Sequence, residues 1–215
     1  MKAYCQMGLD IGFMDGQETI KTTLEQAEPH LAKLKGLAKG EQAGILIAGM
    51  EKSWPEIRAI ASKPVDKAQA AALLVAADGV VNGGSALVEL LLPGSPSSEP
   101  VVIVDRMRFL TQRITSLYLL TNWGVDKPEL QESYKDAMTK FDDWLIELSH
   151  LSQRSEGLGT GFKNISRKWV MYKESTAKGQ LPSLAVRMLE SIMSQLDSML
   201  KDPALTAAGA PTSAN

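Results

Sequence analysis

The chain has 215 residues, of which 44% are hydrophobic and 22% are charged, and its formal net charge is −2. This is the composition of an ordinary globular protein, long enough to bury a core in one large or two small domains. The near-neutral charge excludes a general nucleic-acid binder, which needs a basic surface to displace counterions. Apolar runs stop short of the roughly 20 residues that a membrane-spanning helix needs, so no membrane span is predicted.

Helical periodicity dominates the chain, and no stretch of alternating apolar and polar residues bounded by turns predicts a strand. Gly40 ends one predicted helix and Pro64 precedes another. The segment PGSPSSEP, residues 93–100, has the composition of a linker. Helices are predicted over residues 2–12, 17–38, 41–61, 65–92, 100–123, 127–153, 160–178 and 181–201.

Four of these eight predicted helices precede the linker and four follow it. The sequence therefore predicts an all-α protein of two tandem antiparallel four-helix bundle units. Residues 1–92 form the first predicted unit, 93–100 the linker and 101–202 the second unit. The small and polar residues 203–215 predict a disordered tail.

The two halves match when the first is shifted by 114 positions. Tyr4 then falls on Tyr118, the turns GLDIG and WGVDKP coincide, and one further residue of shift brings Trp54 onto Trp169. Any two amphipathic helices can be slid into register, but a shared Tyr, turn and Trp in the same order favour an internal repeat. The matched apolar positions pair Ile20, Leu24, Ala27, Leu31 and Leu34 with Tyr134, Met138, Phe141, Leu145 and Leu148.

The predicted repeat also indicates a missing segment. A helical stretch, residues 101–117, precedes Tyr118 in the second copy, whereas three residues precede Tyr4 in the first. We therefore expect the first unit to be a truncated copy, whose upstream helix and any leader or anchor attached to it are missing.

Catalytic and metal-binding motifs are absent from the sequence. Cys5 is the single cysteine, and no CxxC, HExxH, GxGxxG or P-loop pattern occurs, so no intrachain disulfide, zinc site or nucleotide loop is predicted. The carboxylates lie on helix faces among lysines, which is typical of solvated surfaces. We expect a non-enzymatic protein without a cofactor.

Several residues are predicted to be structural. The four tryptophans are expected to anchor the core or the turns, and Cys5 is expected to be buried. The segment NGGS, residues 82–85, places two glycines inside a predicted helix. It indicates a kink, a close helix crossing or a ligand that approaches the backbone.

The segment DRMRFLTQRITSLYLL, residues 105–120, combines an apolar seam with fixed positive charge. Asp105 can pair with Arg108 at the i,i+3 spacing of a helix. The apolar residues recur at alternating spacings of three and four, which predicts a heptad seam facing partner helices. This seam comprises Met107, Leu110, Ile114, Leu117 and Thr121.

The polar residues of this helix are the candidate site. Arg108, Thr111 and Gln112 lie within about one turn and could form a donor-rich patch. The planar fork of an arginine suits an oxyanion such as a carboxylate or nitrate. Arg106 and Arg113 share another face of the helix. The alternative is that all three arginines are solvated or ion-paired, with little effect on stability.

The segment DRMRFLTQR, followed by LYLL and WGVD, resembles the N-terminal domain of type IV pilus methyl-accepting chemotaxis transducers, the PilJ-type domain. That family has a GRQRMLSQR-like helix, then a Tyr- and Leu-rich stretch and a Gly-containing turn. KAYCQMGLD, residues 2–10, is similar to the segment after this helix in the family's first copy. NarX-type nitrate/nitrite sensor domains have a related helix whose first arginine binds the anion between two subunits. Arg108 stands at that position, Thr111 at the family's Ser and Arg113 at its last arginine.

The resemblance implies a periplasmic, non-enzymatic sensory module that signals through helix shifts and acts with a protein partner or as a homodimer. It implies a small anion as ligand, near Arg108, Thr111, Gln112, Arg106 and Arg113. The alternative function is a structural or protein-interaction bundle without a small-molecule ligand, in which the arginines serve an interface. An exposed apolar patch would favour that alternative.

Overall fold

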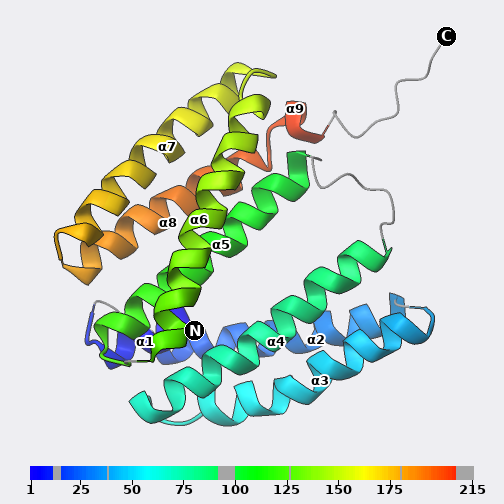
Figure 1. Cartoon of the computed structure of the whole chain (residues 1–215). Coiled ribbons are helices and arrows are strands. Elements are labelled where there is room, and N and C mark those ends of the chain that lie inside the picture. Colours follow the sequence, from blue (N-terminus) through cyan, green and yellow to red (C-terminus); the bar gives the residue numbers. More distant parts are fainter. Residues whose placement is uncertain (12–15, 38, 92–99, 126, 180, 207–215) are drawn as a thin grey trace. The chain divides into compact units, whose positions relative to one another are not determined.

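The structure is a computed structural model that describes residues 1–11, 16–37, 39–91, 100–125, 127–179 and 181–206. Within these ranges the chain forms helices and no strand, which confirms the predicted all-α class (Figure 1). The helices are α1 (Lys2–Gly8), α2 (Gly16–Leu37), α3 (Glu41–Ala61), α4 (Lys67–Leu91), α5 (Pro100–Asn122), α6 (Pro128–Leu151), α7 (Glu156–Ala177), α8 (Pro182–Met199) and α9 (Pro203–Thr206).

The first eight helices follow the predicted order, and two boundaries differ by several residues. Helix α1 ends at Gly8 rather than residue 12, and α7 begins at Glu156 rather than residue 160. Helix α7 starts earlier because the side chain of Ser155 accepts a hydrogen bond from the backbone N–H of Leu158 at 3.0 Å, an N-cap.

The prediction of a disordered tail from residue 203 is wrong for its first residues. Residues 203–206 form the short helix α9, in which Leu205 is buried. Burial of an apolar side chain offsets part of the entropy lost when these residues are ordered. Residues 207–215 of the predicted tail, and residues 93–99 of the predicted linker, lie outside the described part of the chain.

The chain divides into two compact units. The first unit comprises residues 1–95 and 119–125, and the second comprises residues 96–118 and 126–215. The sequence places residues 119–125 in the second unit, but Trp123 packs edge-on against Tyr4 of the first, with ring centroids 6.1 Å apart. This aromatic contact assigns the end of α5 and the turn after it to the first unit.

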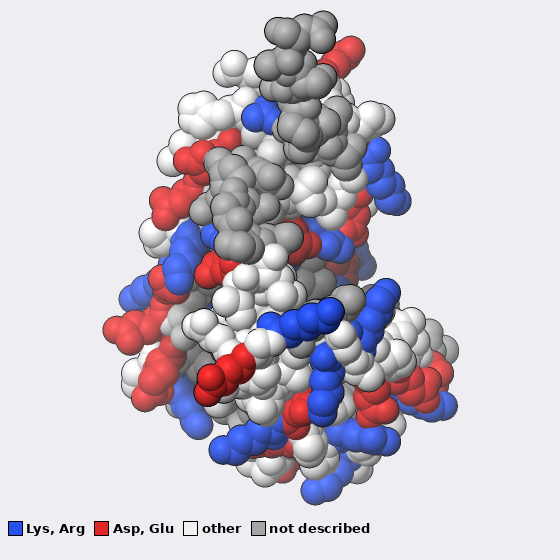
Figure 2. Space-filling view, turned by 90° about the vertical axis from the view of Figure 1, so that its right-hand side faces the viewer, with Lys and Arg blue, Asp and Glu red and all other residues white. Residues whose placement is uncertain are grey.

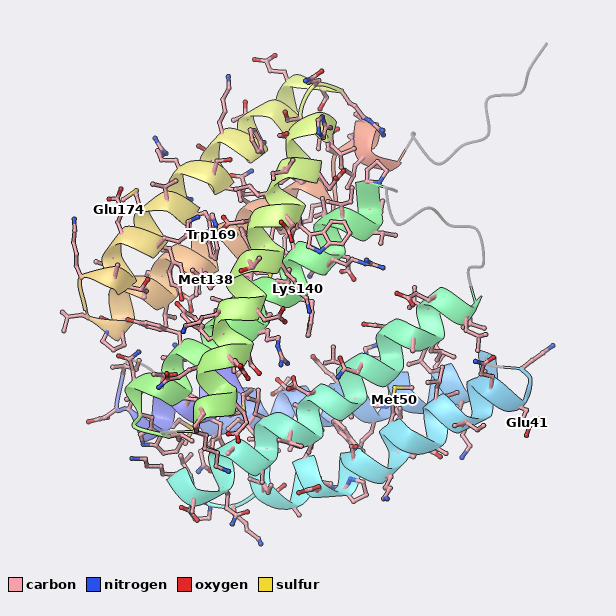
Figure 3. All side chains as sticks on the ribbon, in the orientation of Figure 1. Glu41, Met50, Met138, Lys140, Trp169 and Glu174 are labelled. Carbon is pink, nitrogen blue, oxygen red and sulfur yellow. The ribbon has the colours of Figure 1, made fainter. Side chains whose placement is uncertain are left out.

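The first unit is held together chiefly by α3 and α4, which pack more extensively than its other helix pairs. Its core cluster contains Ala43, Ile47, Met50 and Leu87. Gly83, from the NGGS segment, lies against Met50, and a Cβ at this position would be 2.7 Å from Met50 Cγ. Met50 is labelled in Figure 3. Of the three explanations for NGGS, the structure supports a close helix crossing.

The second unit has an aromatic core contributed by three helices. The rings of Phe141 and Trp169 are 4.1 Å apart, and Trp169 stacks on Tyr172 at 5.4 Å. Tyr118 packs on Tyr134 and Tyr172, whose hydroxyls lie 2.8 Å apart. Burial raises the pKa of both Tyr134 and Tyr172, because it disfavours the charged phenolate.

The predicted apolar seam of α5 is buried at four of its five positions. Met107, Leu110, Ile114 and Leu117 are buried, whereas Thr121 is exposed near the end of the helix. The seam therefore faces partner helices, as the spacing predicts.

Helix α4 is unusually apolar. It is the one helix in the described ranges that is long and apolar enough to cross a membrane by length and composition, with a mean hydropathy of 1.6. Core helices of water-soluble proteins meet the same criteria, so this is weak evidence for a span. Only 28% of the apolar window is buried, which leaves Val75 and Val88 exposed.

Cys5 is fully buried in the first unit, as predicted. Burial raises the pKa of its thiol from about 9 to about 12, because a thiolate would be desolvated there. A thiol that remains protonated is a poor nucleophile, which fits a structural role for this residue.

Candidate functional site

Arg108 connects carboxylates on two helices. Its Nε donates a hydrogen bond to Asp197 of α8 at 2.7 Å, and its terminal nitrogen donates to Asp105 at 2.9 Å. The pairing with Asp105 confirms the i,i+3 prediction. Partial burial acts to lower the pKa of Arg108, but the hydrogen bonds to Asp197 and Asp105 outweigh it and raise the pKa.

Arg106 projects toward a different helix. Its guanidinium carbon lies 5.0 Å from the centroid of the Trp144 ring of α6, within the range of a cation–π contact. Arg113, which shares this face by sequence spacing, is partly exposed. The arginines of α5 therefore reach both α6 and α8 rather than one common point.

Thr111 and Gln112 do not complete a patch around Arg108. The hydroxyl of Thr111 is buried and donates to the backbone oxygen of Met107 at 2.7 Å. Gln112 is exposed one turn beyond Arg108. Of the five predicted ligand-binding residues, Thr111 is thus buried, and Arg106 and Arg108 reach toward different helices.

The same helix-ending turn occurs in both halves of the sequence at an offset of 114 residues. Leu9, Asp10 and Ile11 donate to the backbone oxygens four, three and five residues earlier, and Trp123, Gly124 and Val125 do the same. Asp10 and Gly124 both have left-handed backbones, with φ of 53° and 75°. This is a Schellman-type end, repeated residue for residue.

An acid, a tryptophan and a base also recur between the second and third helices of each unit. In the first unit Arg58 pairs with Glu28 at 2.7 Å, and in the second Lys173 pairs with Asp142 at 2.8 Å. A tryptophan stands four residues before the base in both units, and Trp169 donates to Asp142 at 2.7 Å. These matches lie at offsets of 114 and 115 residues, in agreement with the predicted repeat.

Substitutions at the two left-handed turn residues, Asp10 and Gly124, should change the free energy of unfolding in opposite directions. Asp10→Gly should stabilise the first unit by up to about 1 kcal/mol, because glycine adopts positive φ without steric cost. Gly124→Ala should destabilise the turn by about 1–2 kcal/mol for the same reason. Urea unfolding of both variants checks the signs, and a stabilising Gly124→Ala would contradict the assigned turn.

A cavity of about 390 Å³ lies in the first unit, between the first half of α2, the end of α3 and the residues after α3. Its apolar lining consists of Ile20, Leu24, Ala61 and Val65. The rest of the lining is polar and consists of Gln17, Ser62 and charged residues of both signs, including the paired Arg58 and Glu28.

The described residues contain no group of three or more His, Cys, Asp or Glu side chains that could hold a metal ion. On the face shown in Figure 2, basic and acidic side chains are interspersed among uncharged ones. A surface mixed in this way does not present the concentrated positive field with which proteins bind nucleic acids.

Comparison of the chain with protein-family models, with curated proteins and with solved structures finds no match. The resemblance to the PilJ-type domain therefore stays a prediction based on the residues quoted above.

Two features of the site region were missed by sequence reasoning. Asp197 is 89 residues from Arg108, so no local spacing indicates their pairing. The internal repeat could have indicated the cavity, because the alignment places Ile20, which lines the cavity, against the larger Tyr134.

Proposed function

We propose that the chain is a non-enzymatic sensory module, resembling the PilJ-type domain, that acts in the periplasm by shifting helices within a bundle. The observation that carries this proposal is the accessible link between α5 and α8, the ion pair of Arg108 with Asp197. The side chain of Arg108 is 36% exposed and that of Asp197 is 43% exposed, so solutes can reach both.

A small oxyanion can replace Asp197 at Arg108. Ion pairs between exposed side chains contribute about 0–1 kcal/mol, so breaking one costs little. An anion such as nitrate or acetate offers the guanidinium the same acceptor atoms as the carboxylate of Asp197. Displacement would remove the link between α5 and α8, and the freed helices could shift relative to each other.

Differential scanning calorimetry with nitrate, nitrite, acetate and citrate tests this exchange, with chloride at equal ionic strength as reference. Asp197→Asn should strengthen the stabilisation by an anion, because the competing carboxylate is gone, and Arg108→Ala should abolish it. An anion at about ten times its Kd raises the free energy of unfolding by about 1.4 kcal/mol. Lys35→Ala is the matched control, since Lys35 is an ion-paired base of the first unit that does not line the cavity.

If no anion stabilises either the wild type or Asp197→Asn, the sensory proposal is wrong. The second candidate, a protein-interaction bundle that binds a partner protein or a second copy, would then be favoured. It is supported by the apolar residues exposed on α3 and α4, which include Ile45 at 65% and Val75 at 70%. A concentration-dependent mass in light scattering would support the homodimer form of this candidate.

A further inference from the structure

The cavity of the first unit is lined by Ile20 and Ala61, whose equivalents in the second unit are Tyr134 and its hydrogen-bond partner Thr176. Ile20 is equivalent to Tyr134 at the offset of 114 residues that also relates the two Schellman-type turns. In the second unit the Tyr134 ring packs 6.3 Å from the Tyr118 ring, and its hydroxyl meets that of Tyr172. An isoleucine fills less volume than a tyrosine at this place, and Ile20 lines the cavity.

The apolar part of the cavity suits a ring without a hydroxyl group. Tyr134 hydrogen-bonds through its hydroxyl to Tyr172 and Thr176. The equivalent residues of the first unit, 115 positions earlier, are Ile57 and Ala61, which offer no side-chain hydrogen bond. A phenol would therefore leave its hydroxyl unpaired, whereas a phenyl ring would only bury apolar surface.

The charged part of the cavity can bind a zwitterion. Arg58 is paired with Glu28, so a ligand could bind either residue only by breaking this ion pair. Lys21 and Lys63 have no ion-pair partner among the described residues, and the same holds for Glu18 and Glu25. As far as the described residues go, the cavity lining thus presents two unpaired ammonium groups and two unpaired carboxylates beside its apolar residues.

We propose that this cavity binds a free aromatic amino acid, with the ring against Ile20, Leu24 and Ala61 and the zwitterionic group among the unpaired charges. The volume of about 390 Å³ lies within the range of small-molecule sites, about 300–1,000 Å³. This site is independent of the anion exchange proposed at Arg108, which lies in the second unit.

Titration of the full-length ¹⁵N-labelled protein with L-phenylalanine, followed by NMR, tests the proposal. We expect saturable shifts of backbone amides in residues 17–28 and 58–65. L-Alanine, which lacks the ring, should bind at least about tenfold more weakly. The same weakening is expected for 3-phenylpropionate, which lacks the ammonium group, and for 2-phenylethylamine, which lacks the carboxylate.

Two cavity-filling variants show whether the shifts arise at this site. Ile20→Tyr introduces the ring found in the second unit, and Ala61→Leu fills the cavity from α3. Each should weaken L-phenylalanine binding by at least about tenfold while keeping its helical circular dichroism. Ile45→Tyr is the matched control, because the same change at a 65% exposed position should leave binding intact.

Three results would overturn the proposal. The first is the absence of saturable shifts with L-phenylalanine in the wild type. The second is equal binding of L-alanine, 3-phenylpropionate or 2-phenylethylamine. The third is unchanged binding in a well-folded Ile20→Tyr or Ala61→Leu variant. The calorimetric experiment on Arg108 does not depend on any of these results, so the two proposals can fail separately.

Discussion

Replacing Trp169 by alanine should lower the free energy of unfolding of the second unit by about 3–5 kcal/mol. The indole is 1% exposed, lies 4.1 Å from the Phe141 ring and stacks on Tyr172. Trp169 is labelled on α7 in Figure 3. Truncation would leave a cavity between these rings and remove the hydrogen bond from the indole N–H to Asp142. Urea unfolding followed by circular dichroism measures the loss.

The equivalent tryptophan of the first unit is the natural comparison. Trp54 is partly exposed, and its indole nitrogen is buried with no hydrogen-bond partner in the described part of the chain. Trp54→Ala should therefore cost less than Trp169→Ala. The loss for Trp169→Phe should lie between the losses for these two variants. This change keeps a ring in the aromatic core, but it leaves Lys173 as the donor to Asp142. Equal losses for Trp54→Ala and Trp169→Ala would contradict this account.

Replacing Gly8 by alanine should destabilise the first unit by about 1–3 kcal/mol, the usual effect of overpacking. Gly8 is the last residue of α1, and a Cβ there would overlap the six-membered ring of Trp123. The indole is rigid and already packs on Tyr4, so it cannot move aside without losing that contact. The change should appear as a lower urea midpoint.

Gly49→Ala is the matched control for Gly8→Ala. Gly49 lies inside α3, and no heavy atom would come within 4 Å of an added Cβ. Alanine is favoured over glycine in a helix by about 1 kcal/mol, so this variant should be more stable than the wild type. Opposite signs for the two substitutions would establish that Trp123, rather than a general intolerance of alanine, limits position 8.

Local pattern was sufficient to predict most of the fold. The seam of α5, the order of the first eight helices and the pairing of Asp105 with Arg108 all depend on residues within a few turns of one another. The close approach of α3 and α4 was one of three explanations for NGGS, and a single sequence does not distinguish among them. Helix α9 was missed because the surrounding composition resembles a disordered tail.

The candidate site was harder to predict because it depends on contacts between distant segments. Spacing along one helix places Arg108 near Thr111, but it does not show that the Thr111 hydroxyl donates to the backbone oxygen of Met107 one turn earlier. It also cannot show that Asp197 meets Arg108. The internal repeat contained a signal that was not used, since its register aligns the acid–base pairs of the two units and places Ile20, which lines the cavity, against Tyr134.

The position of Trp123 allows the two units to be observed separately by fluorescence. Because the turn after α5 belongs to the first unit, Trp54 and Trp123 lie in that unit and Trp144 and Trp169 in the other. Each unit therefore contains two of the four indoles. If phenylalanine replaced both tryptophans of one unit, the tryptophan fluorescence would come from the other unit alone. Unfolding or ligand binding could then be assigned to that unit without cutting the polypeptide.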